Sequence, residues 1–213
     1  MLEDLYNRQT SLSLHRYTFI TVVGIGGIGS WVALNLALSG CVGHLYLIDD
    51  DIVESTNLNR TPFRICDIGE YKVNAMKYLI LERRTNIEIT NISERTNEDI
   101  IKQQNEISSY YDNFAIIDCR DQVLTDLYDI KCKWLYKVGY DGSDITIDSN
   151  PQATKVISAG NGYRVIPSFI CPAQLAANLV VSDLLYPETN AFTKTKIISF
   201  DSKYLLKNLI EGK

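Results

Sequence analysis

Three glycines that follow a short apolar run are the first residues whose type and spacing could bind a phosphate. Gly24, Gly26 and Gly29 lie in VVGIGGIGS, directly before an apolar helix pattern. A glycine turn between a strand and a helix lets backbone N–H groups approach a phosphate, and the helix N-terminus adds partial positive charge. Asp49 ends the next apolar run, twenty residues after Gly29, where a carboxylate can accept hydrogen bonds from ribose hydroxyls. This spacing predicts a nucleotide site.

Four further residues extend the pattern beyond what a dinucleotide needs. Asn57 and Arg60 follow the acidic run DDD, Lys72 lies near the start of the next predicted helix, and Asp121 ends DCRD. A triphosphate carries more charge than the pyrophosphate bridge of a dinucleotide, and splitting it calls for cations and a divalent metal. The set therefore favours ATP with Mg²⁺.

The elements that must position these groups can be predicted from periodicity. We expect strands over Phe19–Val23, His44–Asp51, Ile87–Ile92, Phe114–Asp118 and Trp134–Val138, and helices over Ser30–Ser39, Gly69–Arg84, Asn97–Ile107 and Asp121–Lys131. This alternation predicts an α/β fold with a doubly wound, Rossmann-like, mostly parallel sheet up to about Gly139.

The last third of the chain has a different texture. The short runs DITID, KVISA and GYRVIPSF predict antiparallel strands, and TKIISF predicts a last strand. A strong helix is expected over Ala173–Tyr186, with Pro172 in its first turn. We expect one domain over 1–213, with an N-terminal arm (1–17), a nucleotide-binding core (18–140) and a C-terminal sheet extension and helix (141–213).

Composition excludes several classes of protein. The net charge of the 213 residues is −5, which argues against a nucleic-acid or anionic-membrane partner. No apolar run reaches the ~18 residues of a membrane helix, and the first residues lack a signal-peptide pattern, so a cytoplasmic location is expected. None of the five cysteines forms a Cys-x-x-Cys pair, so no structural zinc is expected.

Taken together, GIGGIGS, LIDDDIVESTNLNR, Lys72 and DCRD resemble the ThiF/MoeB/HesA family, the activating enzymes of ubiquitin-like and sulfur-carrier proteins. The resemblance covers roughly Leu2 to Tyr140, and more weakly the helix after Pro172. It implies ATP-dependent adenylation of the C-terminal carboxylate of a small carrier protein or peptide, giving an acyl-adenylate and pyrophosphate.

The resemblance also implies roles for individual residues. Arg60, Lys72 and Asp121 would be catalytic, with Asp121 holding Mg²⁺. Arg8 of YNRQ would reach into the partner subunit of a homodimer. The residues implied in ATP binding are Gly24, Gly26, Gly27, Gly29, Asp49, Asp51, Asn57, Arg60 and Lys72. The chain departs from the family in lacking zinc-binding cysteine pairs and an inserted cysteine domain, and in carrying Gln122 after Asp121.

The cysteines allow a covalent step but do not require one. Cys171, before a predicted helix, and Cys66, in the loop after Arg60, are the two candidate nucleophiles. Acids flank Cys119 and should raise its pKa, while Cys41 and Cys132 resemble small core or helix residues. The reaction can equally end at the adenylate.

Three alternatives remain open at this point. An NAD-dependent oxidoreductase would explain the segment from Gly24 to Asp49 and nothing after it. A non-catalytic ThiF-fold dimerisation scaffold would need none of Arg60, Lys72 and Asp121. A relative of the tRNA-threonylcarbamoyladenosine dehydratases would call for a basic RNA-facing patch. Each site residue also has a structural reading as a turn acid, a turn former, a surface charge or a helix cap.

Overall fold

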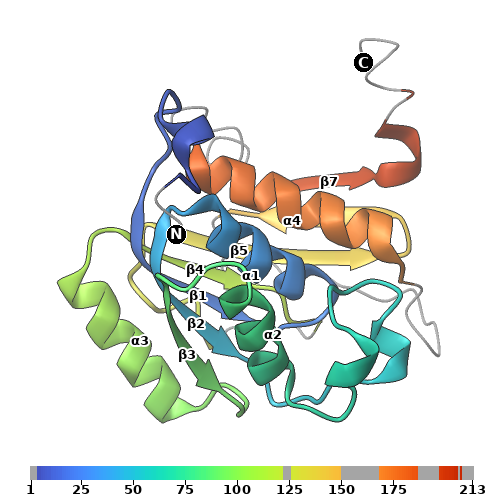
Figure 1. Ribbon diagram of the computed structural model, residues 1–213, viewed down its shortest axis with the longest axis horizontal. Helices are drawn as coiled ribbons and strands as arrows, with labels where there is room; N and C mark the ends of the chain where they lie inside the picture. Colours follow the sequence, from blue (N-terminus) through green and yellow to red (C-terminus); the bar gives the residue numbers. More distant parts are fainter. Residues whose placement is uncertain (1–3, 122–125, 150–167, 187–196, 206, 208–213) are drawn as a thin grey trace.

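In the described part of the chain, a seven-stranded sheet forms the centre of the molecule (Figure 1). The structure is a computed structural model and describes residues 4–121, 126–149, 168–186, 197–205 and 207. The strand order is β3-β2-β1-β4-β5-β6-β7. The first five strands are parallel: β1 (Tyr17–Val23), β2 (Val42–Ile48), β3 (Glu88–Ile92), β4 (Phe114–Asp118) and β5 (Trp134–Asp141). The last two, β6 (Asp144–Asp148) and β7 (Ile197–Asp201), continue the sheet in antiparallel fashion.

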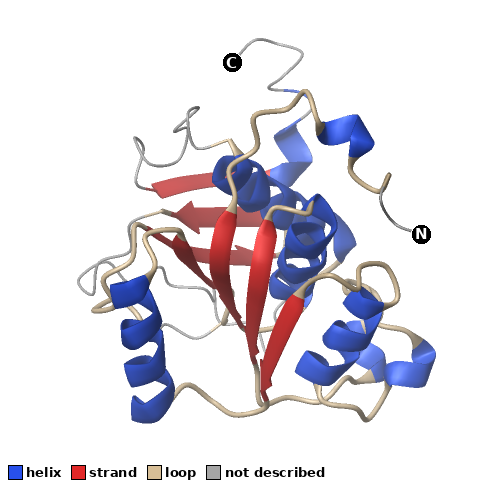
Figure 2. Cartoon of the chain, turned by 60° about the vertical axis from the view of Figure 1, so that its left-hand side comes forward, coloured by secondary structure: helices blue, strands red, loops and turns tan. Residues whose placement is uncertain are grey.

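Helices cover both faces of the sheet, which is why the central strands are apolar on both sides. Helices α1 (Gly27–Ser39), α2 (Lys72–Leu81) and α4 (Ile170–Leu185) pack with the larger hydrophobic core on one face. Helix α3 (Glu98–Tyr110) buries Ile100 and Ile107 in a second cluster with Val23 and Ile116. Figure 2 shows this separation of one helix from the other three across the strands.

The predicted fold class is confirmed, including the antiparallel strands at the end of the sheet. Each expected strand and helix up to β5 lies within a few residues of its predicted position, except the helix over 121–131. Described residues 126–130 form turns and a bend instead, and Asp126 pairs with Arg120. The predicted strand KVISA and nearly all of GYRVIPSF lie outside the described residues, whereas Pro172 lies in the first turn of α4 as expected.

The N-terminal arm packs at the far end of α1 from the glycine turn. Gly40 ends α1 with φ 72°, and a Cβ there would lie 2.5 Å from the ring of Tyr6. The backbone N–H of His15 donates to the carbonyl of Leu185 at 3.0 Å. The arm is thus fixed near the C-terminal ends of α1 and α4. Within the part of the chain that the structure describes, no helix has the length and apolar character needed to cross a bilayer.

Candidate nucleotide site

The glycine turn joins β1 to α1 at the carboxyl edge of the parallel strands. Gly24 has φ +83°, a left-handed conformation that favours glycine. A Cβ at Gly29 would lie 1.8 Å from the carbonyl oxygen of Gly24, so only glycine lets the helix start this close to the strand. A Cβ at Gly26 would meet nothing within 4 Å. The turn therefore leaves an open approach at Gly26 beside a helix N-terminus without a side-chain cap.

Asp49 ties the end of β2 to this turn. One carboxylate oxygen accepts the backbone N–H of Ile25 at 2.5 Å, and the other accepts the N–H of Asp51 at 2.8 Å. Burial raises the pKa of Asp49 above its ordinary value, although Lys72 and the two N–H groups oppose that shift. The carboxylate thus faces the glycine turn.

Lys72 is the first residue of α2 and is nearly buried, at 8% exposure. Its ammonium lies 2.7 Å from a carboxylate oxygen of Asp51 and 4.0 Å from one of Asp49. The backbone N–H of Lys72 also donates to the carbonyl of Asp51 at 3.0 Å. The side chain is therefore fixed beside the glycine turn rather than solvated as a surface charge.

Asn57 and Arg60 lie in the loop that leads from β2 toward α2. Asn57 is buried, and its side-chain oxygen accepts the backbone N–H of Glu54 at 3.0 Å. This bond forms part of a capping box around a 3₁₀ turn at Ser55–Asn57. The amide of Asn57 therefore stabilises the turn, which is the role of a turn-forming residue. The carbonyl of Arg60 accepts the indole N–H of Trp31 on α1 at 2.9 Å, which attaches this loop to the helix that the glycines begin.

Tyr140, near the end of β5, completes this side of the site and was not identified from the sequence. A Cβ at Gly27 would lie 2.6 Å from its hydroxyl oxygen, so the phenol occupies the space that a side chain at Gly27 would fill. Burial raises the pKa of Tyr140 above its ordinary value, and the nearby side chains of Ser168 and Arg60 oppose that shift. Gly27, the third glycine of GIGGIG, was the available signal, since a glycine there leaves room for a close neighbour.

The loop after β4 packs directly on the glycine turn. A Cβ at Gly24 would lie 2.9 Å from the backbone nitrogen of Arg120. Asp121, the next residue, is exposed, and among the described residues its carboxylate makes no hydrogen bond or ion pair. An exposed carboxylate without a protein partner suits Mg²⁺, which prefers oxygen ligands.

Arg120 is the second residue that sequence reasoning missed. Its guanidinium binds both oxygens of the buried Asp118, at 2.9 Å each, and both oxygens of Asp126, at 2.7 and 3.0 Å. Thr96 accepts a further bond at 2.7 Å. Burial alone would raise the pKa of Asp126, but the hydrogen bonds from Arg120 and Thr96 bring this pKa below its ordinary value. Arg120 thereby fixes the loop that carries Asp121.

Arg8 lies far from the glycine turn of its own chain. It is exposed in a 3₁₀ turn at Asn7–Gln9, on the arm that packs at the C-terminal end of α1. The 13 residues of α1 separate the two ends by about 20 Å. Within one chain the structure therefore groups the remaining charged candidates around the glycine turn and leaves Arg8 apart.

The two candidate nucleophiles, Cys66 and Cys171, are both exposed free thiols. The sulfur of Cys66 lies 3.8 Å from a carboxylate oxygen of Asp67. Cys171 lies in the first turn of α4. Burial, followed by the charge of Asp118, raises the pKa of Cys119, and burial raises that of Cys132 to about 12. The buried Cys41 is a core residue, as expected.

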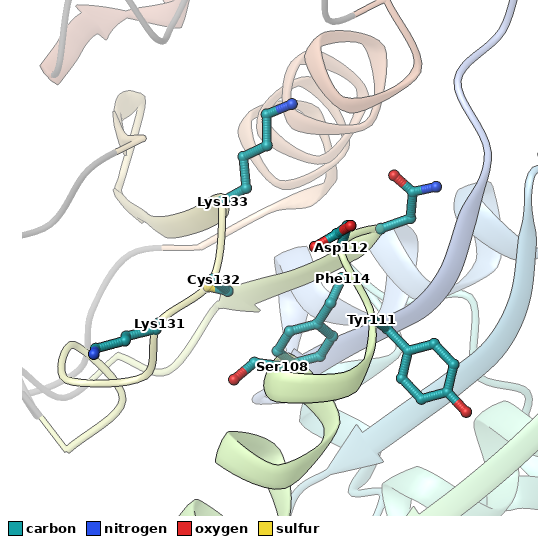
Figure 3. A pocket seen from close by; sticks show the side chains of 8 residues that line it. Ser108, Tyr111, Asp112, Phe114, Lys131, Cys132 and Lys133 are labelled. Atoms are coloured by element: carbon teal, nitrogen blue, oxygen red, sulfur yellow. The ribbon is translucent and has the colours of Figure 1, made fainter.

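A surface pocket of about 330 Å³ lies at the amino-terminal ends of the parallel strands, away from the glycine turn (Figure 3). It opens at the start of β4 rather than at its end, beside Phe114, Cys132 and Lys133. Since β1 and β4 are parallel, with Val23 beside Asp118, the glycine turn lies at the other end of these strands. The pocket is therefore separate from the nucleotide site.

Comparison with known proteins gives one family match and several partial relatives. The model of the ThiF family matches residues 6–156. An "Adenylyltransferase and sulfurtransferase MOCS3" of Drosophila grimshawi is 29% identical over 161 residues, covering 75% of this chain and 34% of the relative. The "NEDD8-activating enzyme E1 catalytic subunit" of Arabidopsis thaliana is 37% identical over 102 residues, 47% of this chain and 21% of the relative.

Two further similarities concern a short segment and the fold. A "tRNA threonylcarbamoyladenosine dehydratase" of Haemophilus influenzae is 48% identical over 67 residues, 31% of this chain and 25% of the relative. The crystal structure of PaaA superposes with a TM-score of 0.62 at 26% identity, covering 87% of this chain and 58% of PaaA. The chain spans about a third of the length of the MOCS3 relative.

Proposed function

The chain belongs to the ThiF family, and from that premise we propose that it activates a carboxylate by adenylation with ATP. The substrate would be the C-terminal carboxylate of a small ubiquitin-like or sulfur-carrier protein or peptide. The adenylyltransferase relative and the NEDD8-activating relative support this class of reaction. The observation that carries the proposal is the position of Lys72, which is paired with Asp51 and lies near Asp49, the carboxylate that binds the glycine turn. Arg60 lies on a loop that Trp31 attaches to α1.

In the proposed reaction, a carboxylate oxygen attacks the α-phosphorus of ATP. The bond between that phosphorus and the bridging oxygen breaks, and pyrophosphate leaves with the electron pair. Lys72 and Arg60 would stabilise the charge that develops on the phosphates, and the open backbone at Gly26 would receive them. Asp121 would hold Mg²⁺, which shields phosphate charge when it is bound.

Asp49, Asp51 and Asn57 would support the nucleotide. Asp49 faces the glycine turn, where ribose hydroxyls can donate to it. Asp51 would hold Lys72 in place through the 2.7 Å ion pair, and Asn57 would hold the loop that carries Arg60. Arg8 would act on the partner subunit of a homodimer, since its own glycine turn is at the other end of α1.

The proposal is tested by exchange of labelled pyrophosphate into ATP with a panel of peptides that end in Gly-Gly. Each peptide is supplied with a free C-terminal carboxylate and, as its matched control, with a C-terminal amide. Exchange with the carboxylate and not with the amide supports adenylation of the C-terminus. ATP binding without exchange for any peptide would favour the scaffold alternative, and binding of NAD⁺ instead of ATP would favour an oxidoreductase.

A second candidate is activation of a carboxylate on tRNA, as in the dehydratase relative. It is favoured by the 48% identity over 67 residues with that relative. The net charge of −5 weighs against an RNA-binding surface. A titration with tRNA at low salt distinguishes the two, because a tRNA substrate should bind through phosphate contacts that weaken as salt rises.

A further inference from the structure

We propose that Lys137, on β5, is a positioning residue for the metal end of the nucleotide site. Its ammonium holds the backbone carbonyl of Arg120, and Asp121, the proposed Mg²⁺ ligand, is the next residue. The inference rests on the proposed function and goes beyond it, because Lys137 lies outside every motif that carries the resemblance to the family.

Lys137 is buried beside the carboxyl end of β4. It is the register partner of Asp118, the last residue of that strand, and it is 6% exposed. The ammonium donates to the carbonyl of Arg120 and lies 3.3 Å from a carboxylate oxygen of Asp118. A buried charge needs such partners, since leaving it unpaired is costly. Lys137 therefore joins β5 both to the end of β4 and to the peptide that leads into Asp121.

The peptide group that Lys137 holds is separate from the ion pairs of Arg120. The guanidinium of Arg120 binds Asp118 and Asp126. Its backbone carbonyl accepts from Lys137 instead. Because the peptide bond is planar, a fixed carbonyl on Arg120 also fixes the backbone nitrogen and the Cα of Asp121. Lys137 thus acts on the backbone of Asp121 more directly than the Arg120 side chain does.

The same segment packs on the glycine turn. A Cβ on Gly24 would lie 2.9 Å from the backbone nitrogen of Arg120 and 3.1 Å from the carbonyl oxygen of Cys119. The segment that leads into Asp121 therefore contacts both the turn proposed to receive the phosphates and the ammonium of Lys137. The lysine fixes this segment against the turn.

The ligand requirements of Mg²⁺ make the position of this backbone important. Asp121 is exposed, so the place of its carboxylate depends on the backbone that carries it. Mg²⁺ demands near-ideal octahedral geometry with oxygen ligands at about 2.0–2.1 Å, which tolerates little displacement of a carboxylate. Loss of the Lys137 hydrogen bond should therefore weaken ATP binding only where Mg²⁺ is present.

The test is calorimetric titration with ATP, in excess Mg²⁺ and separately in EDTA, of four forms of the chain. They are the wild type, Lys137→Met, Asp121→Ala and the double variant. Lys137→Met keeps the length of the side chain and removes the ammonium, so binding in Mg²⁺ should weaken about 2- to 10-fold, the range for one hydrogen bond. Binding in EDTA should be unchanged. In the Asp121→Ala background, Lys137→Met should have no further effect, because Lys137 acts through Asp121.

Lys77→Met is the matched control. The ammonium of Lys77 also donates to a backbone carbonyl, at 3.3 Å, but this carbonyl belongs to Ile89 on β3. The control variant should bind ATP as the wild type does in both solutions.

Unchanged affinity of Lys137→Met in Mg²⁺, or equal weakening in Mg²⁺ and in EDTA, would overturn the inference while the proposed function stands. A further loss when Lys137→Met is added to Asp121→Ala would do the same. Failure of the wild-type chain to bind ATP in both solutions would overturn the inference and the proposed function together.

If Lys137→Met does not fold, Lys137→Gln replaces it. The glutamine side chain is one bond shorter and uncharged, and it still offers N–H donors beside Asp118. The same loss of affinity, confined to Mg²⁺, is then expected, and weakening in EDTA as well would contradict the assignment.

Discussion

The carboxylate of Asp49 accepts the backbone N–H of Ile25 at 2.5 Å, and this bond joins the second strand to the glycine turn. The same carboxylate accepts the N–H of Asp51 and lies 4.0 Å from the ammonium of Lys72. One acidic side chain therefore fixes the glycine turn, the start of the next loop and the cation beside them.

Asp49→Ala should destabilise the chain even without nucleotide. It leaves two backbone N–H groups without their acceptor, which typically costs about 1–3 kcal/mol of unfolding free energy. Asp49→Asn keeps one side-chain acceptor and should lose less. Urea unfolding followed by circular dichroism measures both, and equal stability of wild type and Asp49→Ala would contradict the account.

Lys72→Met should weaken Mg–ATP binding more than tenfold. The substitution keeps the length of the buried stem and removes the cation that lies between Asp51 and Asp49. Lys203→Met, an exposed lysine paired with Asp201, is the matched control and should leave binding unchanged. Calorimetry of the two variants beside wild type gives the comparison, and similar affinities for all three would show that Lys72 does not face the nucleotide.

Arg120→Ala should lower the unfolding free energy by about 3 kcal/mol. It leaves the fully buried Asp118 and the partly buried Asp126 without the guanidinium that binds both. Arg95→Ala removes a 2.8 Å ion pair with Asp50 in which the arginine is 77% exposed, and should cost less than about 1 kcal/mol. Chemical denaturation of the two variants tests the difference, which the account requires to be large.

The sequence predicts the site residues that are placed by their spacing along the chain, and not those whose partners meet only in the folded sheet. Gly24, Gly29 and Asp49 could be placed from spacing, because a strand, a turn and a helix fix where each must lie. Arg120 and Tyr140 could not, because their partners Asp126 and Gly27 come together only when β4 and β5 are placed in the sheet. The helix predicted over 121–131 is wrong in its described part, where residues 126–130 form turns and a bend and the carboxylate of Asp126 binds the guanidinium of Arg120.

Acid should destabilise the chain between about pH 7 and pH 5. His15 and His44 are the two histidines of the sequence, and burial lowers the pKa of each below its ordinary value. The unfolded state then binds more protons than the folded state in this window, so stability falls as the pH falls through the ordinary histidine pKa of about 6.5. Thermal unfolding between pH 5 and pH 8 measures the slope. The double variant His15→Gln, His44→Gln should flatten it, and an unchanged slope would assign the effect elsewhere.

The central claim is that the glycine turn, with Lys72 and Arg60 beside it, binds a triphosphate. Titration of the wild-type chain with Mg–ATP and, separately, with NAD⁺ under identical conditions tests it most directly. The account predicts that Mg–ATP binds at least tenfold more tightly than NAD⁺. Tighter binding of NAD⁺, or no binding of Mg–ATP, would contradict it.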